Sequence, residues 1–146
     1  MDTIRVRLAQ KLPEWEALDV VPSEEVPVGS KTDEAIRYGA RSWTDMFSPR
    51  QLLGHGIASE VFREMIEEEM STGEINQIRR SAFVYLAFAL DKLRDYNSRM
   101  TRWIPNRETM ANTFDRHDFA FKWSYAEMAI MVDGQGYDWA IDQTAK

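Results

Sequence analysis

The chain has no cysteine among its 146 residues, and its only histidines are His55 and His117. Disulfides and thiolate–zinc sites are therefore excluded, and a metal site built from histidines is not expected. No window holds the roughly 18 apolar residues of a membrane span. The N-terminus lacks the basic and apolar regions of a signal peptide. These absences predict a cytoplasmic protein that does not enter a membrane and holds no metal.

Basic residues are in the minority, because 18 lysines and arginines face 24 aspartates and glutamates, which gives a net charge of −6. This balance argues against a surface that binds phosphate everywhere. The charge is nevertheless uneven, with a run of glutamates over 60–74 and an excess of arginine and lysine over 79–116. We interpret the asymmetry either as two solvated helix faces of opposite sign or as surfaces that bind a partner.

Apolar residues make up 44% of the chain and charged residues 29%, which is ordinary for a globular protein of one domain. Residues 1–34 are weakly patterned and interrupted by prolines. We expect an extended N-terminal segment there, with a short strand over 4–8, where apolar residues alternate with arginine. Residues 35–146 are expected to form a helical domain.

A first helix is predicted to begin after Ser48. Pro49 suits the first helical position, and Gln51 can complete a capping box with the Ser48 hydroxyl. Apolar residues then recur at spacings of three and four as far as Met70, which predicts one apolar face. The last ten residues are expected to form a helical turn that packs on the body.

A second helix is predicted over about 72–97, begun by a capping box of Ser71 and Glu74. Uncharged apolar and aromatic residues fill 82–90, so we expect the middle of this helix to be buried on all sides and the helix to form the centre of a mainly α fold. Pro105 favours a further short helix over 106–113. Residues 119–123 alternate like a strand, which could form a hairpin with the N-terminal segment, although a helix fits them equally well.

Paired carboxylates offer one candidate for chemistry. Asp91 and Asp95 lie four residues apart on one helix face, where they could share a metal or a proton. Lys92 and Arg94 flank them, so ion pairs within the helix are the expected alternative. Neither histidine has a serine, a cysteine or a second histidine at motif spacing. We therefore expect the histidines to be ordinary hydrogen-bonding residues.

Three blocks of sequence carry a resemblance to a known family. Residues 37–51 end in Trp-Thr-Asp-Met-Phe-Ser-Pro-Arg-Gln, and residues 85–98 end in Leu-Arg-Asp-Tyr-Asn-Ser. Residues 112–127 run from Asn-Thr-Phe-Asp to Trp-Ser-Tyr-Ala-Glu. In this order they resemble the C-terminal segment of the adenine-specific DNA methylases that contain a zinc ribbon. The resemblance implies a parent enzyme that uses S-adenosylmethionine, and a catalytic methyltransferase half, in the same or an adjacent chain, as partner.

The residues that carry methyl transfer in that family are missing. An adenine methyltransferase needs a cofactor site and a polar clamp on the flipped base, which the family builds from a Gly-rich turn and an Asp-Pro-Pro-Tyr box. Neither motif occurs here, so no catalytic residue and no cofactor site is expected in this chain. The resemblance implies a non-catalytic segment that supports the catalytic domain or assists DNA recognition. A free-standing helical protein-interaction module is the alternative, and an independent enzyme is the third possibility.

A loop that follows the second predicted helix is the candidate nucleic-acid site. Arginine can hold phosphate, a tryptophan face can stack on an unpaired base, and asparagine can bond base edges. The candidate residues are Arg99, Arg102, Trp103, Arg107, Asn112 and Arg116. The resemblance to the family extends to this region through an Arg-Trp pair and the Asn-Thr-Phe block. The alternative is a polar network, with Asp95 and Asn97 as members, that ties the loop to the helix end and places Trp103 in the core.

Overall fold

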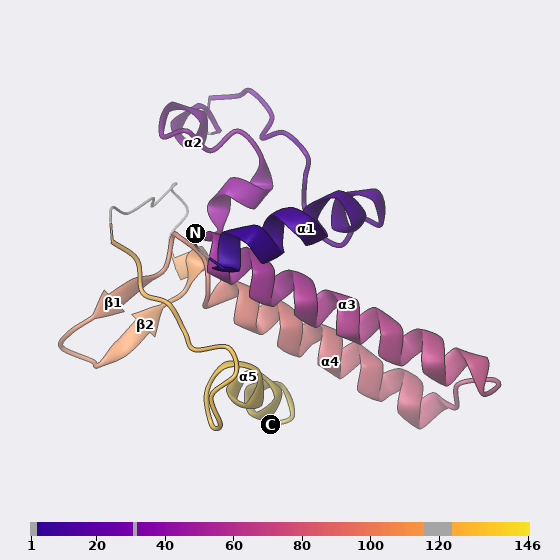
Figure 1. The fold of residues 1–146 in the computed structure, drawn as a ribbon. Helices are drawn as coiled ribbons and strands as arrows, with labels where there is room; N and C mark the ends of the chain where they lie inside the picture. The colour runs from indigo at the N-terminus through magenta and orange to yellow at the C-terminus, as the bar shows by residue number, and fades with distance from the viewer. Residues whose placement is uncertain (1–2, 31, 116–123) are drawn as a thin grey trace.

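The computed structural model describes residues 3–30, 32–115 and 124–146. Within these ranges the chain forms five α-helices, two short 3-10 helices and one β-hairpin (Figure 1), so the expected mainly α fold is confirmed. The helices are α1 (Thr3–Ala17), α2 (Asp33–Arg37), α3 (Pro49–Ser71), α4 (Gln77–Asp95) and α5 (Gly136–Thr144). The 3-10 helices are η1 (Trp43–Met46) and η2 (Thr113–Asp115). No helix in the described part of the chain is long and apolar enough to cross a membrane.

Helix α3 begins where the sequence predicts. The Ser48 hydroxyl accepts a hydrogen bond from the backbone N of Gln51 at 3.2 Å, and the Gln51 Oε1 accepts one from the backbone N of Ser48 at 2.8 Å. Pro49 occupies the first helical position, where an N–H would have no partner within the helix, so its absence costs no hydrogen bond. Helices α3 and α4 form a long helical hairpin whose far end projects beyond the other elements (Figure 1).

Helix α4 begins later than predicted. Its N-cap is Asn76, whose side chain accepts from the backbone N of Arg79 at 3.0 Å. Ser71 is not a cap but the last residue of α3, and its hydroxyl donates to the carbonyl of Glu68 at 2.7 Å. Gly73 has a φ of 136°, which only glycine adopts freely, and this turn separates the two helices.

The expectation that the middle of α4 is buried on all sides is wrong. Only Ala89 and Leu93 of this helix are buried, whereas Ile78 is 81%, Tyr85 57% and Phe88 55% exposed. Helix α3 packs along one side of α4, and α5 packs on it around the buried Ala89 and Leu93. The described elements therefore leave much of the apolar surface of α4 uncovered.

The N-terminal residues form helix α1, so the strand expected over 4–8 is wrong, and residues 3–17 are helical rather than extended. Leu8 and Trp15 lie on the buried face of α1, which packs against Leu52 and Gly56 of α3. A Cβ at Gly56 would overlap the Trp15 ring, which is fully buried. Packing against α3 thus stabilises a helix that local alternation did not reveal.

The β-hairpin lies outside both expected segments. Strand β1 (Arg102–Ile104) pairs antiparallel with β2 (Thr109–Ala111), and Trp103 lies opposite Met110. The turn between them replaces the helix expected over 106–113. The strand considered for 119–123 falls outside the described residues. At the C-terminus, the expected helical turn is confirmed as α5, with Ala140 fully buried against α4.

Candidate functional site

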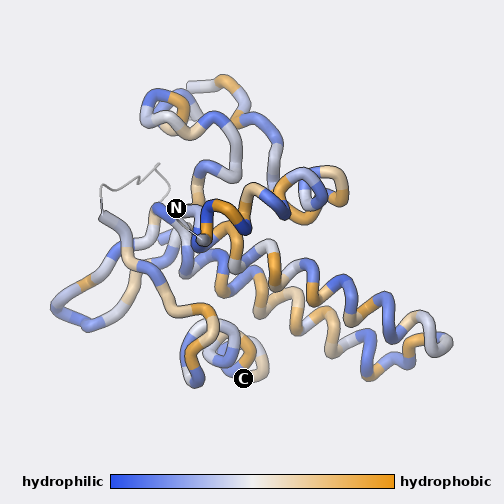
Figure 2. The backbone as a smooth tube through the Cα atoms, viewed as in Figure 1, coloured by the Kyte–Doolittle hydropathy of each residue, from blue (hydrophilic) through white to orange (hydrophobic). Residues whose placement is uncertain are grey.

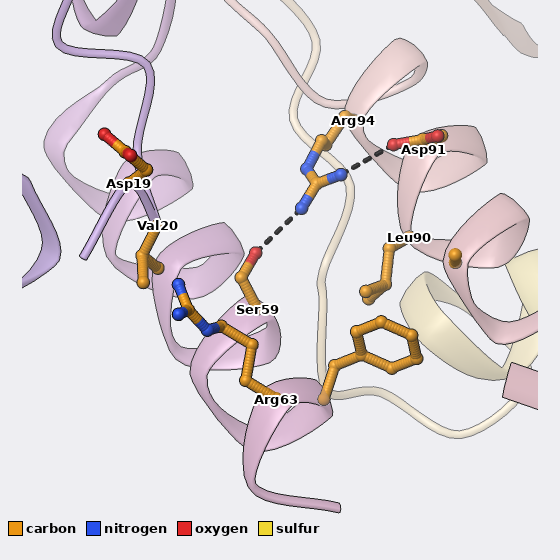
Figure 3. Close-up of a pocket in the computed structure, with 9 residues that line it drawn as sticks. Asp19, Val20, Ser59, Arg63, Leu90, Asp91 and Arg94 are labelled. Carbon is orange, nitrogen blue, oxygen red and sulfur yellow. Dashed lines mark hydrogen bonds and ion pairs between the residues drawn. The ribbon is translucent and has the colours of Figure 1, made fainter. Parts of the chain in front are cut away.

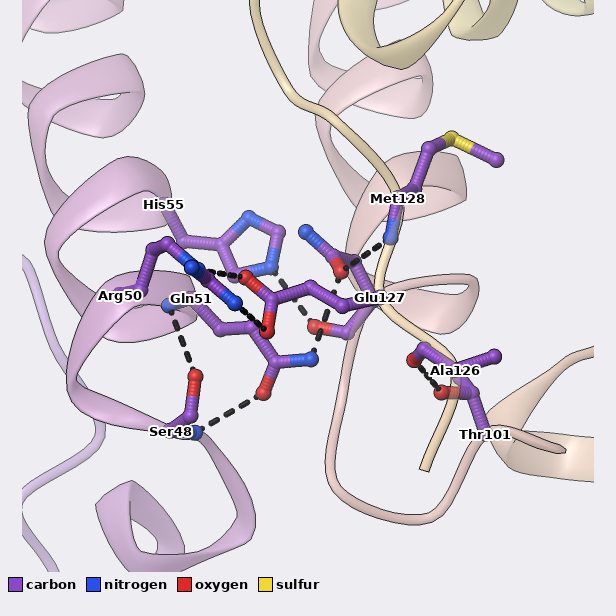
Figure 4. A network of polar contacts seen from close by, with 9 residues as sticks. Ser48, Arg50, Gln51, His55, Thr101, Ala126, Glu127 and Met128 are labelled. Atoms are coloured by element: carbon purple, nitrogen blue, oxygen red, sulfur yellow. Dashed lines mark hydrogen bonds and ion pairs between the residues drawn. The ribbon is translucent and has the colours of Figure 1, made fainter. Parts of the chain in front are cut away.

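Residues from three distant parts of the sequence meet in one buried polar network (Figure 4). The Asn97 Oδ1 accepts a hydrogen bond from the Gln51 Nε2 at 3.3 Å and another from the backbone N of Met128 at 3.1 Å. Gln51 and Asn97 are both fully buried. The His55 Nε2 lies 3.0 Å from the carbonyl oxygen of Asn97 and donates to it. The network therefore joins α3, the end of α4 and the segment that precedes α5.

Backbone N–H groups determine how the two amides of this network point. The Gln51 Oε1 accepts from the backbone N of Ser48, so the Gln51 Nε2 must face Asn97. The backbone N of Met128 can only donate, so the Asn97 Oδ1 must face it. The capping box at the start of α3 thus sets the direction of a contact with the end of α4.

His55 is held as a neutral ring inside the network. Burial lowers its pKa from 6.5 to about 4, and the positive charge of Arg94 acts in the same direction. The bond to the Asn97 carbonyl opposes this shift without cancelling it. The ring also packs edge-on against Phe47, with 5.4 Å between the ring centroids. A buried, bonded and neutral imidazole suits a structural role.

The segment before α5 is fastened to the rest of the molecule by two further contacts. Arg50 of α3 forms a two-pronged ion pair with Glu127, in which Nη2 and Oε2 are 3.0 Å apart. The Thr101 hydroxyl donates to the carbonyl of Ala126 at 2.5 Å, and the Ala126 backbone N donates to the Thr101 carbonyl. These contacts keep Met128 in place against Asn97.

Asp95 joins the end of α4 to the residues that follow the β-hairpin. Its Oδ2 accepts from the Asn112 Nδ2 at 2.6 Å, and its Oδ1 accepts from the backbone N of Phe114 at 3.1 Å. Asp95 therefore lies in a different cluster from Asp91, and the two carboxylates do not converge. No group of three or more histidine, aspartate or glutamate side chains in the described ranges is placed to hold a metal ion.

Two of the four basic candidates after α4 contact protein groups. The Arg99 Nη1 donates to the carbonyl of Asp45 at 2.9 Å, and the Arg102 Nη2 lies 2.6 Å from the Asp115 Oδ2. Arg107 is exposed at the hairpin turn. Arg116 lies outside the residues that the structure describes. The basic side chains are thus divided between internal contacts and one exposed position in the described loop.

Trp103 is not a core residue, because 53% of its surface is exposed on strand β1. Phe114, in the 3-10 helix that follows β2, is 78% exposed, so a second aromatic residue near the hairpin faces solvent. Exposed rings of this kind can stack on bases or pack against protein.

Arg94 bridges α3 and α4 beside a small cavity of about 200 Å³ (Figure 3). Its Nη1 forms the expected intrahelical ion pair with Asp91 at 2.6 Å, and its Nη2 donates to the Ser59 hydroxyl at 2.7 Å. Pockets for small ligands measure roughly 300–1,000 Å³. The cavity is smaller than that range and its arginine is already bonded, so we assign it no ligand.

Comparisons with protein-family models, with curated proteins and with solved structures find no match to this chain. The candidate site is therefore interpreted from its own geometry. Sequence reasoning assigned Gln51 only to the helix cap and gave Thr101 no role. Gln51 bonds Asn97, 46 residues away, and Thr101 bonds Ala126, 25 residues away. No local sequence pattern predicts contacts over such separations.

Proposed function

We propose that this chain is a non-catalytic segment of a DNA adenine-N6 methyltransferase, that it supports the catalytic domain, and that it works in the cytoplasm. The observation that carries the proposal is the convergence of the three family-like blocks. Gln51 of the first block bonds Asn97 of the second, and Arg50 of the first pairs with Glu127 of the third. The three blocks follow the order of the family and also meet in space, as expected if they form the same structural unit as in that family.

The buried position of these contacts favours support over chemistry. Gln51 and Asn97 are fully buried and bonded to each other, so neither is available to a substrate. The pairing ties the surrounding elements to one arrangement, because separating them would leave buried donors without an acceptor. The catalytic methyltransferase half, in the same or an adjacent chain, would supply the S-adenosylmethionine site and the clamp on adenine.

Weak assistance to DNA recognition is the lesser part of the proposal. Arg99, Arg102 and Asn112 bond protein groups, which reduces what they can offer to phosphates and bases. Arg107 and Trp103 remain exposed at the hairpin. The net charge of −6 opposes the approach of phosphate, so a contact with DNA at this small area is expected to be weak.

A free-standing helical interaction module is the second candidate, and the uncovered apolar surface of α4 favours it. Both candidates require a protein partner, but they differ in what that partner carries. A neighbouring reading frame with a Gly-rich cofactor turn and an Asp-Pro-Pro-Tyr box supports the methyltransferase. A neighbouring frame without these motifs supports the interaction module.

The test combines the chain with that neighbouring methyltransferase polypeptide. We expect co-purification, and we expect the transfer of tritiated methyl groups from S-adenosylmethionine to adenine in DNA to rise when the chain is added. Asn97→Ala should reduce both effects, whereas Asn106→Ala in the exposed hairpin turn is the matched control. A fully active catalytic polypeptide that never binds the chain would contradict the proposal.

A further inference from the structure

An apolar groove runs along the seam between α3 and α4, with a cavity volume of about 1060 Å³. Ile57, Val61 and Met65 of α3 line one side, and Leu86 of α4 lies on the other. Figure 2 shows hydrophobic residues recurring along both helices of this hairpin. The groove is separate from the polar network described above, except at one end, where Arg50, Glu127 and Met128 line it.

The α3 side of the groove faces solvent to an unusual degree. Ile57 is 44%, Val61 46% and Met65 45% exposed, and the three residues follow one another at four-residue spacing. Residues four apart on a helix are neighbours, so they form a continuous apolar stripe. A continuous exposed apolar surface marks a site where another molecule binds.

The shape of the groove fits a helix. At one end the segment before α5 crosses α3, where Ile130 packs directly against Gly54. Helix α5 borders the groove with Tyr137 and Ile141. The lined part of α3, from Leu53 to Met65, is about 18 Å long at the usual helical rise. Residues of α1, α3, α4 and α5 therefore line a groove of the length that a further helix of roughly 12 residues would occupy.

The outer edge of the groove is acidic. Glu64 and Glu68 follow Val61 and Met65 by three residues, so they border the apolar stripe. Both glutamates are exposed, and neither forms an ion pair within the described residues. Arg50, which lines the groove, is paired with Glu127. Lys11, which Glu64 also attracts, is paired with Glu60.

We infer that this groove binds an amphipathic helix of a protein partner, with lysine or arginine bordering the apolar face of that helix. Apolar side chains of the helix would cover the α3 stripe, and its basic residues would meet Glu64 and Glu68. A second copy of the chain is a poorer occupant, because it adds another acidic edge and another net charge of −6. The inference does not depend on the partner being a methyltransferase.

Synthetic helical peptides test the inference on the full chain. The first peptide carries leucine at helical spacing with lysine beside it, the second replaces lysine by glutamate, and the third keeps lysine but replaces leucine by asparagine. Fluorescence anisotropy should show the leucine–lysine peptide binding at least about tenfold more tightly than either companion. Equal binding of the leucine–lysine and asparagine–lysine peptides would overturn the inference.

Variants of the chain locate the binding. Glu64→Lys/Glu68→Lys should weaken the leucine–lysine peptide about tenfold and strengthen the leucine–glutamate peptide. Glu16→Lys/Glu25→Lys makes the same charge change on exposed residues elsewhere and should have little effect. An equal loss in both double variants would show that the peptide follows overall charge, which overturns the inference.

A third variant separates a partner helix from a second copy. Val61→Asp should abolish binding of the leucine–lysine peptide without lowering the melting temperature, because about half of the Val61 side chain already faces solvent. Light scattering of the parent chain should give a monomer. A dimer that Val61→Asp dissociates would assign the groove to a second copy instead and would overturn the inference.

Discussion

The side chains of Gln51 and Asn97 meet 3.3 Å apart although 46 positions separate them in the sequence, and both are fully buried. Asn97 also accepts from the backbone N of Met128, so one carbonyl oxygen satisfies two buried donors. Its own Nδ2 has no hydrogen-bond partner among the described residues. A single amide oxygen thus connects α3, the end of α4 and the segment before α5.

Replacing Asn97 is therefore expected to be costly. Asn97→Ala leaves two buried donors, on Gln51 and Met128, without an acceptor, and each such group costs roughly 1–3 kcal/mol. We expect a loss of about 2–4 kcal/mol in the free energy of unfolding, measured by urea denaturation. Asn106→Ala, in the exposed hairpin turn, is the control and should change stability by less than about 0.5 kcal/mol. Similar losses in the two variants would refute a central role for the network.

The pH dependence of stability follows from His55. Its pKa in the folded chain is about 4, mainly because burial disfavours the charged ring, against 6.5 as its ordinary value. The unfolded chain therefore takes up a proton at higher pH than the folded chain. The neutral His55 ring therefore contributes its full stabilisation of the folded chain above pH 6.5, and this contribution is lost as the pH falls from 6.5 toward 4. Its size is on the order of 3 kcal/mol.

His55→Gln isolates this contribution from that of the carboxylates. Glutamine can still donate to the Asn97 carbonyl but takes up no proton, so the variant should lose less stability than the parent between pH 7 and pH 5. Urea denaturation at both pH values measures the difference. Parallel pH profiles for the two proteins would show that the histidine is not buried as described.

Two glycines of α3 should respond in opposite ways to alanine. A methyl group at Gly56 would overlap the rigid, buried Trp15 ring, whereas at Gly54 it would meet the flexible end of Ile130. We expect Gly56→Ala to destabilise the chain by about 1–3 kcal/mol, because overpacking outweighs the helix propensity of alanine. Gly54→Ala should be neutral or stabilising by up to about 1 kcal/mol. Thermal melting should therefore give a lower melting temperature for Gly56→Ala than for Gly54→Ala.

Local signals in the sequence predicted some parts of the fold well. The start of α3 was predictable, because Ser48 and Gln51 bond each other within four residues and Pro49 suits the first helical position. The packing of the C-terminal helix was also predictable from its apolar residues. The late start of α4 was missed because Ser71 and Glu74 form a plausible cap in isolation, while Gly73 ends the preceding helix only through its backbone conformation.

Other parts depended on contacts that no short window contains. Leu8 and Trp15 have helical spacing, but the alternation of arginine with Ile4 and Val6 obscured it, and packing on α3 decides the outcome. The continuous apolar run of α4 predicted burial on all sides, whereas the described fold exposes Tyr85 and Phe88. A pattern shows that apolar surface exists, but it does not show whether the same chain covers that surface.

The final prediction concerns the exposed hairpin. If Trp103 stacks on a base, Trp103→Ala should weaken binding to single-stranded DNA by about 1–3 kcal/mol. Because Trp103 is 53% exposed, we expect the same variant to retain its melting temperature within a few degrees. Arg107→Ala should reduce the slope of log affinity against log salt by about one unit.

Arg102→Ala gives the comparison for this test. Arg102 already pairs with Asp115, so its loss should change the salt slope less than the loss of the exposed Arg107. We expect weak binding at low salt and none detectable at physiological salt, because the net charge of −6 opposes the approach of phosphate. Tight binding at physiological salt would contradict this expectation. Equal slopes for the two arginine variants would place the DNA contact elsewhere than at the tip of the hairpin.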